Sequence, residues 1–333
     1  MDEVMPIRRK KRQQPAWDLY RDGISYSLLS RFINCRERFR IYAVEGLAPI
    51  DTTDSLEFGT IFHRLLEYHA KGYTFPQLER LLSKDGVSSD FLGRLALEIF
   101  RIYAATWKDQ DSKIQYVSQE EVFRTTIYLP SGRKVDLRGK FDEVFRDQGS
   151  LWLQENKTKS QIDEVSLEHT LPFDLQTMLY CHCIRAIYKE APAGVLYNII
   201  RKPGLKQKVK ETDSDFLKRI VSDINSRPEW YYIRYRISFG PKDIDNFAKQ
   251  TLFPLLEQVC LWWESIKANP FQPWTQQDGS TNPHHFSRPF GVYDSFRNGR
   301  GEYFDLITRG VDHGLGLIDS VFPELTPEEN VSN

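Results

Sequence analysis

The segment from residue 120 to residue 156 constrains the fold of this 333-residue chain more than any other. Polar and apolar residues alternate in EEVFRTTIYL (120–129) and in VDLRGKFDEVF (135–145), and a short apolar segment follows at 151–156. A period of two residues is typical of β-strands. The sequences PSGR and RDQGS, which separate the three segments, are rich in turn-forming residues. We therefore predict an antiparallel meander of three strands.

On both sides of this meander, apolar residues recur at the spacing of helices or form short apolar runs. Before the meander we predict helices over residues 24–44, 56–70, 75–84 and 88–108. After it we predict helices over residues 172–189, 213–225 and 241–268, with strands over 194–201 and 230–238. This order of elements indicates the α/β class, with a mixed β-sheet flanked by helices.

The composition is typical of a globular protein, with 40% hydrophobic and 27% charged residues. We expect a basic, flexible arm over residues 1–20, one domain over 21–270 with a helical insertion at about 70–110, and an irregular segment over 271–333 that packs on the core. No apolar run reaches the roughly 18 to 20 residues needed to span a bilayer. The basic N-terminal cluster is not followed by an apolar stretch, as a secretory signal would be. We therefore expect a cytoplasmic protein without a membrane partner.

The net charge of −1 gives the surface no general attraction to nucleic acid. Binding of a polyanion would depend on local basic patches, and the alternative for each patch is a solvated charged surface. The candidates are the cluster Arg8–Arg12 and a central group made of Arg201, Lys202, Lys206, Lys208 and Lys210.

The sequence LQENKTK, at residues 153–159, places a carboxylate and an ammonium group two residues apart at the end of an apolar strand. Glu155 and Lys157 then point to the same face. If the second and third strands of the meander pair through the RDQGS turn, Asp142 comes close to facing Glu155. Two facing carboxylates are tolerated when a cation such as Mg²⁺ lies between them, and Lys157 would flank that cation. On these residues alone, a simple ion pair of Glu155 with Lys157 remains the alternative.

Five motifs between residues 24 and 240 resemble, in the same order, those of the PD-(D/E)XK nuclease superfamily in its RecB-like branch. This branch includes phage exonucleases and the nucleases of the AddB and CRISPR-adaptation types. The motifs are SYSLLSRFINCRERFRI, FGTIFHRLLE with Gly59 and His63, GKFDEV with Asp142, WLQENKTK with Glu155, Lys157 and Thr158, and LQTMLYCHCI with Gln176 and Tyr180. The resemblance implies a restriction-endonuclease-like core with added helical segments.

The resemblance also implies roles for individual residues. The metal ligands would be His63, Asp142, Glu155 and the backbone carbonyl of Asn156, and the metal would be Mg²⁺ or Mn²⁺. Asp142, Glu155 and Lys157 would form the catalytic group, with Lys157 positioning the attacking water. Gln176 and Tyr180 would hold the DNA strand near the metal. Beyond what the resemblance implies, we also expect contacts with DNA from Ser27, Arg31, Lys159, Arg201 and Lys202. A core histidine remains the alternative for His63, and a capping or packing pair remains the alternative for Gln176 with Tyr180.

Many RecB-like relatives hold an iron–sulfur cluster with one cysteine in the leading helix and three near the C-terminus. Cys35 occupies the first of these places. The other expected places hold His285, Phe290 and Phe296. Phenylalanine cannot bind iron, so we expect no iron–sulfur cluster and four reduced cysteines.

The function implied by this resemblance is that of a metal-dependent DNA exonuclease. It would leave 5′-phosphate products in phage-type DNA end processing, recombination or degradation. One alternative is a structure-specific or nicking endonuclease, and another is a catalytically idle DNA-binding or assembly subunit. The chain has no Walker A motif, so a helicase, recombinase or single-strand-binding partner would be a separate polypeptide.

Overall fold

The computed structural model describes residues 13–50, 54–84, 91–271, 287–288, 291–292, 303, 306, 312 and 314–325. The chain divides into two compact units. Unit 1 comprises residues 1–51, 122–139 and 249–333, and unit 2 comprises residues 52–121 and 140–248. Strands β3 (Gln115–Tyr128) and β4 (Lys134–Asp147) contribute residues to both units.

Unit 2 contains a mixed sheet, because β5 (Ser150–Lys159) pairs antiparallel with β4 and parallel with β6 (Gly194–Arg201). Strand β7 (Tyr232–Ser238) then pairs antiparallel with β6. The pairing of β3 with β4 and of β4 with β5 confirms the predicted meander. The helices of unit 2 are α4 (Asp54–Ala70), α5 (Phe75–Lys84), α6 (Phe91–Asp111), α7 (Glu164–Thr170), α8 (Leu175–Tyr188), α9 (Asp213–Ser226), α10 (Pro228–Tyr231) and α11 (Pro241–Phe247), with a short 3₁₀ turn η3 (Leu171–Phe173).

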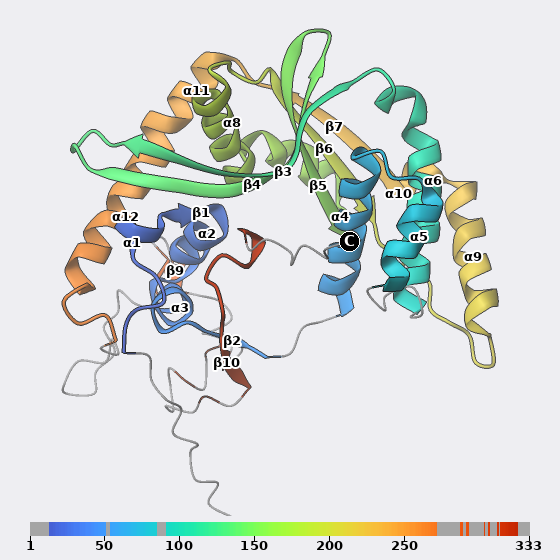
Figure 1. Ribbon diagram of the computed structural model, residues 1–333, viewed down its shortest axis with the longest axis horizontal. Helices are drawn as coiled ribbons and strands as arrows, with labels where there is room; N and C mark the ends of the chain where they lie inside the picture. Colours follow the sequence, from blue (N-terminus) through green and yellow to red (C-terminus); the bar gives the residue numbers. More distant parts are fainter. Residues whose placement is uncertain are drawn as a thin grey trace, which may run out of the picture. The chain divides into compact units, whose positions relative to one another are not determined.

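Strand β6 is buried along its whole length and is covered on both faces. On one face, the hydroxyl of Tyr197 lies 2.6 Å from the hydroxyl of Thr177 on α8. On the other face, Asn198 donates a hydrogen bond to the hydroxyl of Tyr103 on α6 at 2.8 Å. Because neighbouring side chains of a strand point to opposite faces, helices α8 and α6 cover opposite faces of the sheet, as Figure 1 shows. The predicted α/β class, with a mixed sheet flanked by helices, is therefore confirmed.

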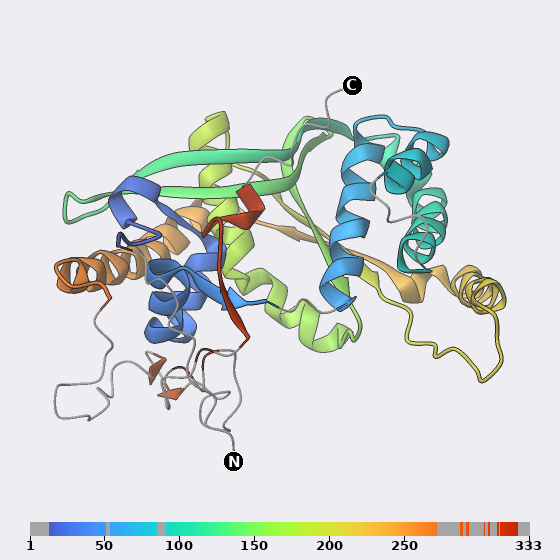
Figure 2. The ribbon, with the colours of Figure 1, turned by 60° about the horizontal axis from the view of Figure 1, so that its bottom comes forward.

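Helices α4, α5, α6 and α9 form one helical group of unit 2, which is seen from two sides in Figures 1 and 2. Their apolar faces share a core in which Phe62 and Phe100 meet edge to face at 5.6 Å between ring centres. Ile200 of β6 and Tyr232 of β7 extend this core to the sheet. Burial of such a group stabilises the fold by removing apolar area from water, and it fixes helix α4 beside the sheet.

Unit 1 is built around an aromatic cluster in which Trp17, Phe39 and Trp263 are almost fully buried. Its sheet pairing is short, with β1 parallel to β4 and β2 antiparallel to β10. The elements of this unit are α1 (Leu19–Asp22), β1 (Ile24–Ser25), α2 (Tyr26–Asn34), α3 (Arg36–Arg40), the π-helical turn η1 (Ile41–Glu45), β2 (Leu47–Pro49), α12 (Phe253–Ile266), β8 (Ser287–Arg288), β9 (Gly291–Val292), β10 (Leu315–Leu317) and η5 (Pro323–Leu325). The π-helical turn η4 (Ala248–Leu252) joins α11 to α12.

Two expectations for the N-terminal part differ from the structure. Trp17 and Leu19 lie within the expected arm, yet both are buried, and the indole N–H of Trp17 donates to the carbonyl of Gly23 at 2.7 Å. The helix expected over residues 24–44 begins two residues later and is interrupted at Cys35, whose backbone is extended with φ −165°. Most of the C-terminal segment expected over 271–333 lies outside the described residues. No helix in the described part of the chain is long and apolar enough to cross a membrane.

Candidate active site

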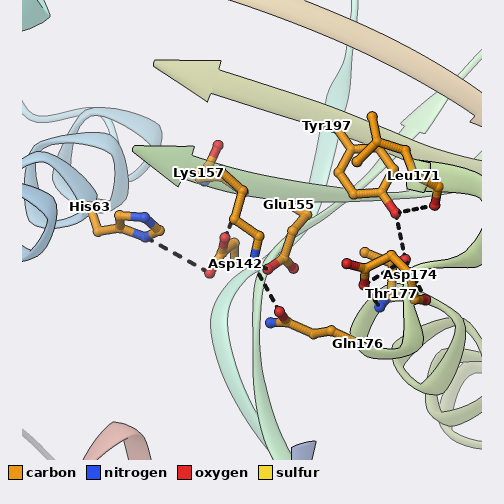
Figure 3. A network of polar contacts seen from close by, with 10 residues as sticks. His63, Asp142, Glu155, Lys157, Leu171, Asp174, Gln176, Thr177 and Tyr197 are labelled. Atoms are coloured by element: carbon orange, nitrogen blue, oxygen red, sulfur yellow. Dashed lines mark hydrogen bonds and ion pairs between the residues drawn. The ribbon is translucent and has the colours of Figure 1, made fainter. Parts of the chain in front are cut away.

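Strand β5 carries Glu155 and Lys157 on one face, as alternation along a strand requires. Glu155 is only 2% exposed. The Lys157 ammonium donates hydrogen bonds to Oε1 of Glu155 at 2.5 Å and to Oε1 of Gln176 on α8 at 2.9 Å, as shown in Figure 3. Burial acts to lower the pKa of Lys157, but the surrounding carboxylates, chiefly that of Glu155, raise it overall. The ammonium group is therefore charged at neutral pH.

Asp142 lies one residue beyond the end of the β4–β5 ladder, which closes with the pair Glu143 and Gln154. Its Oδ2 accepts a hydrogen bond from the backbone N–H of Asn156 at 2.7 Å. Its Oδ1 lies 4.0 Å from Nδ1 of His63. Burial raises the pKa of Asp142, and the hydrogen bond from the backbone N–H of Asn156 opposes the increase. Asp142 thus lies beside Glu155 on the neighbouring strand, close to the facing arrangement expected from the sequence.

His63 reaches this site because helix α4 passes close to β5. A Cβ atom at Gly59 would lie 2.9 Å from the hydroxyl oxygen of Thr158, so a larger residue there would require the Thr158 side chain or the helix to shift. His63 follows one helical turn later on the same face. Burial lowers the pKa of His63 to about 4. The imidazole is therefore neutral at pH 7 and retains a lone pair that can bind a cation.

A third acidic residue, Glu120 on β3, also lies in this site. One donor atom from each of His63, Glu120 and Asp142 lies within 4.8 Å of the others, which is the grouping expected of ligands around a metal ion. Glu120 forms an ion pair with Lys140. Burial and the charge of Asp142 raise the pKa of Glu120 to about 7. Sequence reasoning missed Glu120, and the only signal available was the Glu120–Glu121 doublet in an otherwise alternating strand.

These residues fit a hard divalent cation. Glu155 lies outside the three-residue group, and its Oε2 is buried with no hydrogen-bond partner among the described residues. Burial raises the pKa of Glu155 to about 7 although Lys157 opposes the increase. Buried carboxylates of this kind are stabilised in their charged form by a bound cation. Carboxylate oxygens together with one imidazole nitrogen form a donor set suited to Mg²⁺ or Mn²⁺.

The opposite face of β5 is anchored by a buried polar network. The side-chain Oδ1 of Asn156 accepts from Asn198 at 2.7 Å and from Gln154 at 3.1 Å, and its Nδ2 donates to Glu143 at 3.3 Å. Asn198 in turn donates to the hydroxyl of Tyr103 on helix α6. The side chain of Asn156 is thereby occupied on the rear face, whereas its backbone N–H is bound to Asp142. Its backbone carbonyl as a metal ligand stays a prediction.

The residues expected to contact DNA occupy very different environments in unit 2. Gln176 lies at the site through its bond to Lys157, and Lys159 is exposed at the end of β5. Tyr180 is only 7% exposed and packs edge to face on Phe141 at 5.5 Å, which favours the packing alternative for this residue.

Arg201 and Lys202, the basic pair at the end of β6, contact other residues of unit 2. Arg201 is 6% exposed, stacks over the ring of Trp230 at 3.7 Å and forms an ion pair with Glu164 at 3.3 Å. Lys202 lies 5.3 Å from the ring centre of Phe58. Arg201 thus has an internal structural role, and the burial of its guanidinium argues against direct contact of that group with a DNA backbone.

Ser27 and Arg31 lie on α2 in unit 1, where the guanidinium of Arg31 stacks over the ring of Tyr42 at 4.0 Å. Cys35, the first of the cluster positions expected from the sequence, is buried in the same unit. The other expected cluster positions, His285, Phe290 and Phe296, lie outside the described residues. The remaining cysteines are buried free thiols: Cys181, Cys183 and Cys260.

Comparison with known proteins places these features in a wider context. A model of the PD-(D/E)XK nuclease superfamily matches residues 23–279 of the chain. Among solved structures, the chain is similar to the crystal structure of SSO0001, with 12% sequence identity and a TM-score of 0.28. That similarity covers 62% of this chain and 86% of the other chain. No curated protein matches the sequence.

Proposed function

This chain belongs to the PD-(D/E)XK nuclease superfamily, and from that premise we propose that it is a DNA exonuclease that depends on Mg²⁺ or Mn²⁺. The observation that carries the proposal is the convergence of His63, Asp142, Glu155 and Lys157 at one end of β5 in unit 2. The reaction is hydrolysis of phosphodiester bonds. Membership in the superfamily supports nuclease activity, and the site supports its dependence on a divalent cation.

Some residues of the site would bind the divalent cation, and another would contact the phosphate. His63, Asp142 and Glu155 would hold the ion, and the backbone carbonyl of Asn156 would add a further oxygen. A bound divalent cation supplies two effects there: it lowers the pKa of a coordinated water and offsets the negative charge that grows on the phosphate. The neutral imidazole of His63 has a lone pair available without loss of a proton, whereas the raised pKa of Glu155 means that a bound cation would displace a proton from that carboxyl group.

Besides the bound metal ion, the ammonium group of Lys157 supplies a positive charge from the protein itself. Its ammonium is held between Glu155 and Gln176, so its position is fixed before substrate arrives. It would hold the attacking water by hydrogen bonding and offset charge on a non-bridging phosphate oxygen. The water oxygen forms the new bond to phosphorus and releases a proton to solvent, while the bond from phosphorus to the 3′-oxygen breaks and the 3′-oxygen takes up a proton from solvent. The products are a 3′-hydroxyl end and a 5′-phosphate end.

The proposed branch of the superfamily and the proposed biological role depend on the order of the five sequence motifs. They support a place in the RecB-like branch and a phage-type role in DNA end processing, recombination or degradation, without an iron–sulfur cluster. Lys159, which is exposed at the end of β5, and Gln176 are the residues of unit 2 best placed to contact the DNA strand. A recombinase, a single-strand-binding protein or a helicase would act as a separate partner.

The mode of cleavage is tested with three DNA substrates in Mn²⁺: end-labelled linear duplex, end-labelled single strand and covalently closed circular duplex. We expect the linear substrates to be shortened progressively from an end, to 5′-phosphate products, while the closed circle stays intact. Nicking of the closed circle at a comparable rate would replace this proposal with the endonuclease alternative. Binding of DNA without hydrolysis of any substrate would replace it with the idle DNA-binding alternative.

A further inference from the structure

Strand β3 contains an irregularity at Glu120 that changes which side chains face inward. Before it, Ser118 is partly buried and Val117 is exposed, whereas after it Phe123 is buried and Val122 is exposed. The inward position thus moves from even to odd residue numbers, which requires one extra residue in the strand. This is the pattern of a β-bulge, a device that re-aims a side chain and is common next to active sites.

The backbone of Glu120 is also in an unfavourable conformation. Its φ is +49°, in the left-handed region that side chains other than glycine and asparagine rarely adopt. Conformations of this kind persist where the surrounding structure holds them, and they cluster at functional sites. Gln148, Lys189 and Lys210 share this conformation, so it is the contacts of the Glu120 side chain, and not its backbone alone, that indicate a role.

The bulge sends two successive glutamates to different partners. Glu121 accepts a hydrogen bond from the hydroxyl of Tyr188 on α8. Glu120 instead reaches His63 and Asp142, with donor atoms of the three residues within 4.8 Å of one another. The irregular backbone therefore places one carboxylate, and not its neighbour, in the candidate metal site.

The charge balance around Glu120 leaves room for a cation. Its side chain is 11% exposed and pairs with the ammonium of Lys140. The carboxylate of Asp142 also acts on Glu120, whereas Glu67 is already paired with Lys71. The three carboxylates of Glu120, Asp142 and Glu155 thus face two ammonium groups, those of Lys140 and Lys157. A divalent cation offsets two charges and would accept an oxygen from Glu120 directly.

From these contacts we propose that Glu120 is a further ligand of the divalent cation, together with His63 and Asp142, and that Lys140 is its partner when the cation is absent. This inference rests on the proposed metal-dependent function. The competing explanation is that Glu120 only neutralises Lys140. Under that explanation, loss of Glu120 would still weaken cation binding, because the unpaired ammonium of Lys140 would repel the ion.

The test is the affinity of the protein for Mn²⁺ in the absence of DNA, measured by calorimetry. Glu120→Gln keeps the shape of the side chain and removes its charge, and we expect it to weaken Mn²⁺ binding at least tenfold. Glu121→Gln is the matched control on the same bulge, and we expect its affinity to stay within threefold of wild type. Unchanged affinity in Glu120→Gln would overturn the inference.

A double variant separates a ligand from a simple counter-ion. Loss of the Lys140 ammonium removes its repulsion of the ion in any background, so the double variant Glu120→Gln with Lys140→Gln is compared with Lys140→Gln alone. We expect the double variant to bind Mn²⁺ at least tenfold more weakly than Lys140→Gln, because a ligand is lost. Equal affinity in these two variants would show that Glu120 only served Lys140 and would overturn the inference. Circular dichroism of each variant shows that the fold is retained.

The outcome for Glu120 can be told apart from failure of the metal centre itself. Asp142→Asn is predicted to weaken Mn²⁺ binding whether or not Glu120 is a ligand. If Asp142→Asn lowers the affinity and Glu120→Gln does not, the proposed function stands and only the role of Glu120 fails. If neither variant lowers it, both fail.

Discussion

The ammonium of Lys157 on β5 donates a hydrogen bond to Oε1 of Gln176 on α8, over a distance of 2.9 Å. The same ammonium binds Glu155. This relationship ties a helix to the catalytic strand and fixes the direction of a flexible side chain. Gln176 therefore acts on the reaction through Lys157, as a positioning residue.

We expect Gln176→Ala to lower kcat about 10- to 100-fold, the range seen when supporting partners around metal sites are removed. Mn²⁺ affinity should stay within threefold of wild type, because Gln176 is not among the candidate ligands. Steady-state kinetics and calorimetry measure the two effects. Gln207→Ala is the control, since this glutamine bonds to the loop near Glu211. Equal kcat values in the two variants would contradict the positioning role.

The network behind β5 should contribute to stability. Asn198 is fully buried and donates to Asn156 and Tyr103, so Asn198→Ala leaves both acceptors without that donor. We expect a loss of about 1–3 kcal/mol in the free energy of unfolding, the usual cost of buried groups that lose their partners. Urea denaturation measures it. Asn225→Ala, at an exposed position of α9, should change stability little, and equal losses in both variants would argue against the network.

Cation binding should weaken as the pH falls below 7. The pKa values of Glu120 and Glu155 are both raised to about 7, chiefly by burial, although Lys140 and Lys157 oppose the increase. Below pH 7 both carboxyl groups hold protons that a cation must displace, whereas above pH 7 both groups are deprotonated. His63, with a pKa of about 4, stays neutral across this range and adds no pH dependence.

Between pH 8 and pH 6 we therefore expect Mn²⁺ affinity to fall about tenfold for each carboxyl group that binds the ion. Calorimetry in buffers of different ionisation enthalpy should also detect proton release on binding at pH 6. An affinity that is constant from pH 6 to pH 8, without proton release, would contradict displacement of protons from these carboxyl groups by the cation.

Two basic residues of unit 2 should behave differently towards DNA. Lys159→Ala is expected to weaken DNA binding and to reduce the slope of log affinity against log salt concentration by about 1, as for loss of one phosphate contact. Arg201→Ala should instead lower stability and leave the slope unchanged, because Arg201 is occupied by Trp230 and Glu164. Binding is measured without divalent cations to prevent cleavage. A reduced slope in Arg201→Ala alone would reverse this assignment.

The acid–lysine part of the site could be predicted from the sequence, because short-range geometry determines it. Period-two alternation places Glu155 and Lys157 on one face, and the turn at RDQGS brings Asp142 beside them. Glu120 could not be found in this way. A bulge shifts the alternation at that residue, and the sequence does not show which of two successive glutamates faces the site.

Long-range packing explains the other differences. Helical spacing places Gln176 and Tyr180 on one face of α8, but it does not give their depth: Gln176 reaches Lys157, whereas Tyr180 packs on Phe141. The basic character of Arg201 suggested a DNA contact, but residues from α7 and α10 cover its guanidinium. Contacts between distant segments are absent from a local sequence pattern, so these environments required the structure.

Hydrolysis is expected to depend on a cation held beside Glu155. The most direct measurement is the initial rate of phosphodiester hydrolysis on end-labelled linear duplex, with Mg²⁺, Mn²⁺ or EDTA, for wild type and for Glu155→Ala. We predict hydrolysis by wild type with either cation, none in EDTA, and a loss of at least about 10³-fold in the variant, equivalent to about 4 kcal/mol of transition-state stabilisation. A rate that is unchanged in EDTA or in Glu155→Ala would contradict the account.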